Sequence, residues 1–266
     1  MLNHVTKGEG TPLVILHGAR LDHRHMMDSL EPAFQGLEGW KRIYVDLPGH
    51  GLSQTQAVIN TQDDLLDALI TFLDDLLGDE PYGVIGESRG SYLAQGLAHK
   101  RRERILGVAL IVPGGTPGSD PSLLPKHEVL RPDPSLRDDL PDNQVYRFEN
   151  LMVIQNQSLL DLAANHKIPA MKLFDAEQET RISRSFLFAH DLSGEVQKHD
   201  GPAVIVVGRQ DAMSGYKDGI DLLDAFPRAS LAVLDTAGHA VAWERPEIFK
   251  ALIVDWLERL AYEIAR

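Results

Sequence analysis

The sequence predicts an α/β protein built on one mostly parallel sheet. Apolar, β-branched runs alternate along the chain with amphipathic segments, which is the pattern of strands joined by crossover helices. The runs are continuously apolar, as in parallel strands that are buried on both faces. We expect strands at residues 13–16, 43–45, 83–85, 105–112, 203–207 and 231–234.

Amphipathic segments between and after these runs predict the helices that flank the sheet. Residues 63–77 carry leucines and isoleucine at helical spacing, with aspartates on the opposite side. Residues 88–100 and 247–264 have helical patterns too. Only ten residues precede Thr11, so the N-terminal part of the sheet can hold at most one short strand, and we expect it to be truncated.

One stretch interrupts the alternation. Seven of the 15 prolines lie between residues 113 and 141, together with three glycines. Proline at that density cannot continue a helix or a central strand. Helical patterns follow at 144–157 and 177–190, before the chain returns to a strand. We therefore predict a sheet domain formed by residues 1–112 and 201–266, with residues 113–200 inserted as a helical cap.

Composition excludes several classes of protein. The 266 residues include 26 Lys and Arg against 39 Asp and Glu, a net charge of −13, whereas nucleic-acid binders carry a basic face. Cysteine is absent, which excludes disulfides, cysteine-ligated zinc and a thiol nucleophile. The N-terminus is too polar for a signal peptide, and no apolar stretch is long enough to span a bilayer. We expect a soluble cytoplasmic protein without nucleic-acid or membrane partners.

A predicted strand runs through Gly86-Glu87-Ser88-Arg89-Gly90 into a predicted helix. This is the Gly-x-Ser-x-Gly pattern, in which a serine hydroxyl projects from a tight turn at the carboxyl end of a strand. The flanking glycines let the backbone pass closely, and the amides at the helix N-terminus favour developing negative charge. We interpret Ser88 as a nucleophile.

A serine hydroxyl needs a base, and the base needs a third group to orient it. Asp211 follows the predicted strand at 203–207, and His239 follows the strand at 231–234 in a glycine-containing loop. The chain order Ser88, Asp211, His239 is the order found with this kind of turn. Asp235 is a rival acid, but it lies on the strand that delivers His239, so we favour Asp211.

Attack on a carbonyl also requires hydrogen-bond donors for the oxyanion. His17-Gly18-Ala19 follows the strand at 13–16, and a glycine there lets backbone amides turn inward. We assign the donors to the backbone N–H groups of Ala19 and of Arg89, the residue after the nucleophile.

With these motifs the chain resembles the α/β-hydrolase superfamily. The resemblance implies a mostly parallel sheet, a helical cap over the active site and acyl-serine catalysis without a cofactor. It also implies that the loop 46–53, with His50, is structural. The matching segments are His17-Gly18, Asp-Leu-Pro-Gly-His-Gly-Leu-Ser at 46–53, residues 86–90, Asp211, Gly238-His239 and Glu244-Arg245-Pro246-Glu247.

Two charged residues flank Ser88 where members of this family commonly carry His, Tyr or Asn before the serine and Met, Leu or Gln after it. We expect Arg89 to form a structural ion pair with Glu87 or with another acid nearby. The alternative is that Arg89 faces the pocket and attracts a substrate carboxylate. Arg20 supplies a second cation near the mouth of the site.

The run Asp22-His23-Arg24-His25 offers ligand types that suit zinc or iron. Asp22 is also suited to cap a surface helix, and no further ligand cluster accompanies the run. We predict a helix cap here and no bound metal.

We predict a serine hydrolase that cleaves a small carboxylic ester, a carboxylesterase-like enzyme. Arg20, Phe148, Met152 and Phe186 are candidate substrate-binding residues, although the three in the cap are equally suited to pack its own core. A proline-type aminopeptidase, which needs a cap acid for the substrate amine, and a carbon–carbon bond hydrolase or lyase are alternatives on the same triad. A small-ligand receptor with a slow triad is the alternative from another class. A small molecule is the expected partner, and a homodimer is left open.

Overall fold

The computed structural model describes residues 1–53, 59–114, 124–184, 187–189 and 198–266. Its centre is a seven-stranded sheet in the order β1-β3-β2-β4-β5-β6-β7. β1 is antiparallel to β3, and every other neighbouring pair is parallel, which confirms the predicted sheet. The strands are β1 (His4–Lys7), β2 (Thr11–Leu16), β3 (Trp40–Val45), β4 (Tyr82–Glu87), β5 (Ile105–Ile111), β6 (Ala203–Gly208) and β7 (Ala229–Leu234).

Burial explains why the central strands have continuously apolar sequences. Every residue of β4 and of β6 is buried, because helices cover both faces of the sheet. The two edge strands, β1 and β7, are only partly buried. β1 is the one short strand that residues 1–10 supply.

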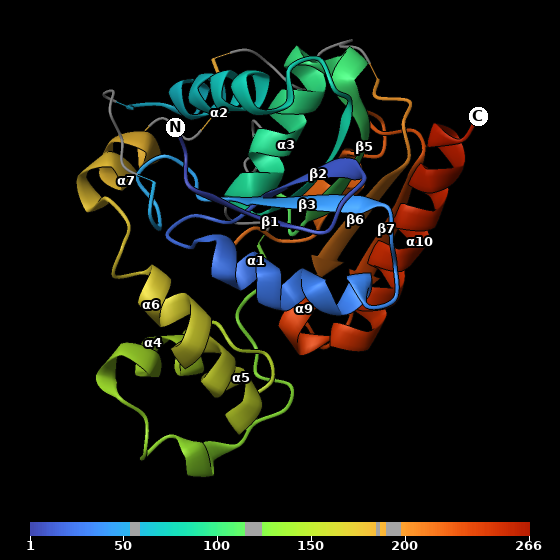
Figure 1. Ribbon diagram of the computed structural model, residues 1–266. Helices are drawn as coiled ribbons and strands as arrows, with labels where there is room; N and C mark the ends of the chain where they lie inside the picture. Colours follow the sequence, from blue (N-terminus) through green and yellow to red (C-terminus); the bar gives the residue numbers. More distant parts are fainter. Residues whose placement is uncertain (54–58, 115–123, 185–186, 190–197) are drawn as a thin grey trace.

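Helices pack on both faces of this sheet (Figure 1). α2 (Gln62–Leu77) and α3 (Arg89–Lys100) bury their leucines against one face. α1 (His23–Leu30) and α10 (Pro246–Ile264) bury theirs against the other. Two shorter helices are α8 (Lys217–Asp221) and α9 (Val241–Glu244), and 3₁₀ turns cover Glu31–Phe34, Arg102–Arg104 and Pro134–Leu136.

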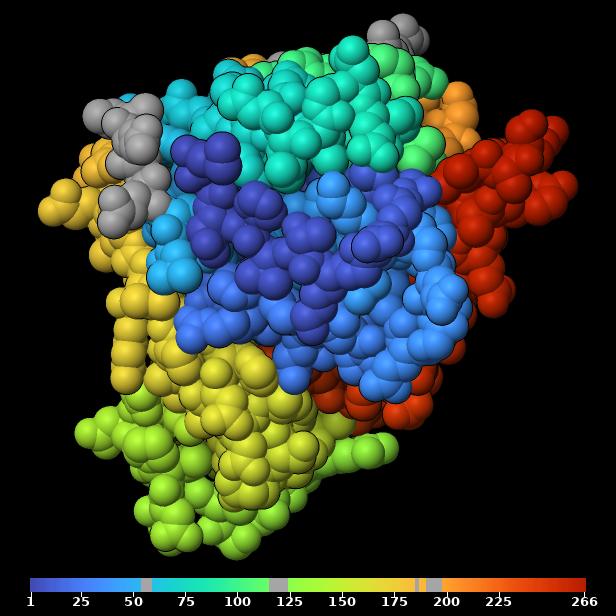
Figure 2. All heavy atoms as spheres, viewed as in Figure 1, coloured from blue at the N-terminus to red at the C-terminus, as the bar shows by residue number. Residues whose placement is uncertain are grey.

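The chain between β5 and β6 carries the helices α4 (Asp142–Asn150), α5 (Gln157–Leu162), α6 (Ile168–Ala170) and α7 (Ala176–Ser183). A π-helical turn joins α5 to α6 at Ala163–Lys167. We call residues 124–184 the cap. Its helices α4, α5 and α6 form a lobe that projects from the sheet, whereas α7 lies against the core (Figures 1 and 2). The boundaries of the predicted domains stay a prediction.

The single helix predicted over 144–157 is wrong, because α4 ends at Asn150 and α5 begins at Gln157. Between them, Val153 donates its backbone N–H to Glu244 Oε1 at 2.9 Å instead of to a helical carbonyl. Asn156 then caps α5 by accepting from the backbone N–H of Leu159 at 2.8 Å. A contact outside the cap therefore interrupts a sequence with helical periodicity.

Among the helices of the described residues, none is both long enough and apolar enough to cross a bilayer.

Candidate active site

Ser88 lies at the tight turn between β4 and α3, with a backbone φ of 54°. This left-handed conformation is uncommon for a residue with a side chain, and the close packing around it explains how it is held. A Cβ on Gly86 would lie 2.2 Å from the carbonyl oxygen of Gly90, and one on Gly90 would lie 2.2 Å from that of Leu16. Only glycine fits at either position, so the spacing of the motif follows from the turn.

The turn leaves backbone donors free beside the serine. Ser88 is the N-cap of α3, and its carbonyl accepts the first helical hydrogen bond, from Tyr92 at 3.1 Å. Amides in the first turn of a helix have no intrahelical acceptor. The N–H of Arg89 is one of them, and the helix dipole adds positive potential at this end.

The loops after β6 and β7 bring Asp211 and His239 together. His239 Nδ1 lies 2.8 Å from Asp211 Oδ2, and Asp211 is fully buried. Asp211 also accepts from the backbone N–H groups of Met213 and Ser214 at 2.8 and 3.0 Å, and from the Ser214 hydroxyl at 2.8 Å. With Asp211 as acceptor, the Nδ1 atom of His239 carries the proton and Nε2 is left as the basic nitrogen.

The rival acid Asp235 is exposed and accepts from Gln210 Nε2 at 2.9 Å. Asp211 is therefore the carboxylate that contacts His239, as the order of the motifs predicts. Burial lowers the pKa of His239, but the charge and hydrogen bond of Asp211 outweigh it and raise that pKa above 6.5. Burial likewise acts to raise the pKa of Asp211, and its contact with His239 outweighs burial and lowers it.

The loop after β2 approaches Ser88. A Cβ on Gly18 would lie 3.3 Å from the Cβ of Ser88, so this glycine permits the close approach. Gly18 and Leu21 close a turn, with Leu21 donating its N–H to the Gly18 carbonyl at 3.3 Å and Arg20 at a φ of 62°. Ala19 stands within this turn, directly after Gly18. Its role as an oxyanion donor, with that of Arg89, stays a prediction.

The charged neighbours of Ser88 have separate partners. The Arg89 guanidinium is buried and forms two hydrogen bonds with Glu179 of α7, one of them 2.9 Å long. Glu87 is also buried and lies 2.7 Å from His25 Nε2. The structural ion pair expected for Arg89 is present, and its partner is a cap acid on α7 that the sequence did not single out.

The cap also contributes a buried lysine, Lys167. Lys167 is buried, and its ammonium lies 4.6 Å from the centre of the Trp243 ring. Burial, together with the nearby charge of Arg147, lowers the pKa of Lys167 to about 8. The charge of Lys167 interacts with the carboxylates of Glu87 and Glu244, which act to raise its pKa, and with His239. Among the described residues, no carboxylate forms an ion pair with Lys167.

Glu244 links the histidine loop to the cap. Its carboxylate accepts from the backbone N–H of Gly238 at 2.6 Å and from that of Val153, in the cap, at 2.9 Å. Glu244 is 6% exposed, and burial raises its pKa. This side chain sets the position of the residue just before His239.

The predicted substrate-binding residues have different surroundings. Phe148 and Met152 are buried in an apolar cluster of the cap that also contains Trp243, which leaves their contact with a substrate a prediction. Arg20 is exposed, and its Nε lies 3.8 Å from Glu179 Oε1. Phe186 lies outside the described residues.

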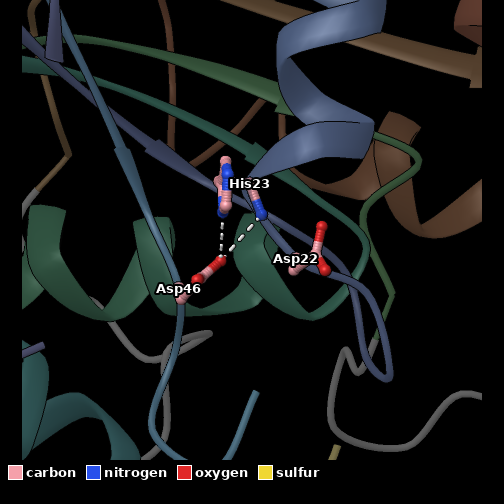
Figure 3. Close-up of side chains that lie close together, drawn as sticks. All are labelled: Asp22, His23 and Asp46. Carbon is pink, nitrogen blue, oxygen red and sulfur yellow. Dashed lines mark hydrogen bonds and ion pairs between the residues drawn. The ribbon is translucent and has the colours of Figure 1, made fainter. Parts of the chain in front are cut away.

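Asp22, His23 and Asp46 approach one another closely enough to be considered for a metal (Figure 3). Their carboxylates already have partners. Asp22 caps α1 and accepts from Arg24, and Asp46 accepts from the N–H and Nδ1 of His23, from Asn3 and from the N–H of Leu52. The contacts of Asp46 anchor the loop 46–53, which explains why these side chains lie close together. Asp22 is the helix cap that the sequence predicts.

Sequence reasoning missed four residues around the site: His25, Lys167, Glu179 and Glu244 as contacts of the triad region. Glu244 lies in the segment 244–247 that resembles the family, and His25 lies in the run 22–25 of metal-ligand types, but neither pattern indicates a contact near Ser88 or His239. Lys167 and Glu179 lie in the cap, where nothing in the linear pattern marks them, because their partners Trp243 and Arg89 are 76 and 90 positions away in the chain.

Named proteins are similar to this chain over nearly its full length. A 2-hydroxy-6-oxononadienedioate/2-hydroxy-6-oxononatrienedioate hydrolase 2 from Pseudomonas putida is 26% identical over 266 residues, covering 97% of this chain and 91% of that protein. The 2-hydroxy-6-oxononadienedioate/2-hydroxy-6-oxononatrienedioate hydrolase of Escherichia coli (strain K12) is 24% identical over 277 residues, covering 97% and 90%.

Solved structures are similar over nearly the full chain as well. An alpha/beta superfamily hydrolase from Oenococcus oeni PSU-1 has a TM-score of 0.86 and 27% identity, covering 98% of this chain and 96% of that one. A thermophilic esterase from Thermogutta terrifontis has a TM-score of 0.69 at 21% identity, covering 97% and 93%, which shows a shared fold. The model of the alpha/beta hydrolase family matches residues 13–252. Because that match spans most of the sequence, the chain belongs to the alpha/beta hydrolase family.

Proposed function

We propose that this protein is a hydrolase in which Ser88 attacks the carbonyl carbon of a small substrate that carries a carboxylate near the scissile bond. The observation that carries the proposal is the position of Lys167, a buried cation against Trp243 that forms no ion pair within 4 Å among the described residues and whose charge interacts with Glu87, Glu244 and His239. A buried charge is costly unless it is paired, and a substrate carboxylate supplies the pair.

In the proposed reaction, Ser88, His239 and Asp211 act together as a catalytic triad. His239, oriented by Asp211, takes the proton of the Ser88 hydroxyl as its oxygen bonds to the carbonyl carbon. The backbone N–H groups of Ala19 and Arg89 hold the oxyanion. Collapse breaks the bond to the leaving group, which receives the proton from His239. Water then attacks the acyl-serine by the same route and releases the acid.

The first candidate substrate is a ketone cleaved at a carbon–carbon bond. The relatives with 24–26% identity are named as hydrolases of oxo-dienedioates, that is, of compounds with a ketone and two carboxylates. In this variant the electron pair of the broken bond remains on the leaving carbon, which takes the proton, and conjugation to a distant carboxylate-bearing group lowers the barrier. Lys167 is suited to hold such a carboxylate.

The second candidate is a carboxylate-bearing ester, which uses the same acyl-serine steps with an alcohol as the leaving group. This candidate is the small carboxylic ester that the sequence predicts, with a carboxylate added to the substrate. The aminopeptidase alternative is not favoured, because Glu179, a buried cap acid at the site, is already paired with Arg89 and does not offer a free carboxylate to a substrate amine.

Paired substrates test this proposal. Mono-p-nitrophenyl succinate and a 2-hydroxy-6-oxo-dienedioate are each compared with their methyl esters, which lack the free carboxylates. Lys167→Met should lower kcat/KM for the free acids roughly tenfold to hundredfold, the worth of a charged hydrogen bond, and should leave the methyl esters within threefold. Lys172→Met, at an exposed lysine of the cap, is the matched control.

Three results contradict the proposal. If Lys167→Met changes kcat/KM by the same factor for the free acids and for their methyl esters, the substrate does not need a carboxylate. Turnover that survives in Ser88→Ala removes the acyl-serine mechanism itself. If a fluorophosphonate labels the serine and no substrate of the panel is turned over, a small-ligand receptor becomes the better interpretation.

A further inference from the structure

Glu179 lies between the two segments that supply the proposed oxyanion donors. Its carboxylate receives two hydrogen bonds from the Arg89 guanidinium, and the Nε of Arg20 is 3.8 Å from its Oε1. Arg89 carries one proposed donor on its own backbone, and Arg20 directly follows Ala19, which carries the other. The side chain of Glu179 is 5% exposed. The Glu179 carboxylate therefore contacts side chains from both segments that carry the proposed oxyanion donors.

The helix that carries Glu179 is fixed to the core by contacts of its own. The N–H of Asp175, the N-cap of α7, donates to the Gly49 carbonyl at 2.8 Å, and Gln178 Nε2 donates to the Pro48 carbonyl at 2.6 Å. Arg181 Nε adds a bond to the Ile59 carbonyl at 3.3 Å. In Figure 1, α7 lies apart from the lobe of α4, α5 and α6. These contacts let α7 hold a side chain in a defined place.

Arg89 and Glu179 form a charged pair, and Glu179 supplies the hydrogen-bond acceptor for the Arg89 guanidinium. Burial acts to raise the pKa of Glu179, but the hydrogen bonds and charge of Arg89 outweigh it and leave the pKa below its ordinary value. Burial lowers the pKa of the nearby His50, and its Nε2 lies 4.0 Å from Glu179 Oε2, beyond hydrogen-bond distance. Arg89 Nε has no partner among the described residues, so Glu179 is the group that satisfies this buried guanidinium. Removing one partner of a buried ion pair is disruptive, because the other charge is left unpaired.

We propose that Glu179 is a positioning residue for the oxyanion hole: by binding Arg89 and Arg20, it makes the placement of both donor segments depend on cap helix α7. This inference rests on the proposed function, since it assumes an oxyanion at Ser88. Displacements of about 1 Å at a reacting group can cost a hundredfold in rate. The cap thereby acts on the chemical step as well as on substrate choice, through a pair formed where the family commonly carries an uncharged residue after the serine.

The test separates kcat from KM. Glu179→Gln should lower kcat tenfold to hundredfold and change KM less than threefold, measured with a methyl ester of the panel above that does not require Lys167. Glu179→Asp keeps the charge but shortens the side chain, and it should lose about tenfold in kcat with little change in melting temperature. Glu177→Gln, an exposed glutamate on the same helix, is the control and should match the wild type.

The inference is overturned if Glu179→Gln or Glu179→Asp lowers the melting temperature while the folded enzyme keeps kcat within threefold of the wild type. A rise in KM alone overturns it too, because that places Glu179 in substrate binding. Ser88→Ala distinguishes this failure from that of the proposed function. If Ser88→Ala abolishes turnover while the Glu179 variants keep it, only the positioning role fails.

Discussion

The two sides of the candidate site are joined to the cap by different means. On the nucleophile side, Glu179 of α7 forms a buried ion pair with the side chain of Arg89. On the histidine side, Glu244 comes from the core and accepts from the backbone N–H groups of Gly238 and of Val153 in the cap. The first junction requires two particular side chains, and the second requires one carboxylate and the main chain.

This difference explains why the sequence marks one of the two contacts with the cap and not the other. A carboxylate that binds main-chain amides needs a residue type at only one position, so Glu244 lies in a recognisable segment close to His239. An ion pair between side chains needs two matching positions, here 90 residues apart. No local pattern in the sequence therefore marks the pair between Arg89 and Glu179.

The largest expected effect comes from breaking the histidine side at its acid. Asp211→Asn presents an amide to His239 Nδ1 and favours the wrong tautomer of the imidazole, so we expect kcat to fall roughly 10⁴-fold. Steady-state kinetics on the best substrate of the panel measure the loss. Asp235→Asn, at the exposed acid of the neighbouring strand, should stay within twofold. Equal losses in the two variants would show that Asp211 has no special role.

The second prediction concerns a variant that weakens the contacts of Glu244 with Gly238 and Val153. Glu244→Gln leaves one of the buried amide donors of Gly238 or Val153 facing an NH₂ group, and an unsatisfied buried donor costs about 1–3 kcal/mol. We expect a loss of that size in the free energy of unfolding, measured by urea denaturation, together with a tenfold or greater fall in kcat. The exposed Glu258→Gln is the control. Unchanged stability and kcat would mean that the junction does not hold His239.

The same contrast marks what could be predicted from the sequence. The strands of the sheet and the places of Ser88, Asp211 and His239 just after strands follow from local patterns, because apolar runs, the glycine spacing around Ser88 and the position of a residue after a strand are all linear features. β4, for example, ends one residue before the nucleophile, as the motif requires.

The cap could not be predicted to the same depth. Its periodicity suggested one helix over 144–157, but Val153 is drawn out of helical geometry by Glu244, a residue 91 positions away. Glu179 and Lys167 carry charges that look like those of any solvated helix face. Their burial depends on tertiary packing against Arg89 and Trp243, which no local pattern encodes.

The third prediction concerns pH and compares charged with neutral substrates. His239 must be neutral to act as a base, and its pKa is raised above 6.5, so kcat/KM should rise with pH through a limb that lies above 6.5. Lys167 must be protonated to bind a carboxylate, and its pKa is about 8, so activity on free acids should fall as pH rises through that value. The methyl esters should show only the first limb. An alkaline limb of equal size for both substrates would assign it to another group.

The smallest effect is expected at Ser214, whose hydroxyl donates to Asp211 at 2.8 Å and lies 3.3 Å from His239 Nδ1. Two backbone N–H groups already hold Asp211. Ser214→Ala should therefore lower kcat less than tenfold. A loss that approaches that of Asp211→Asn would make the hydroxyl, rather than the backbone, the main support of the acid.

The central claim is that Ser88 is the nucleophile and that His239 activates it. The most direct measurement treats the protein with a fluorophosphonate and locates the adduct by peptide mass spectrometry. We predict one adduct on Ser88, none in Ser88→Ala, and labelling slowed at least a hundredfold in His239→Ala. An adduct on another residue, or equal labelling rates for the wild type and His239→Ala, would contradict the account.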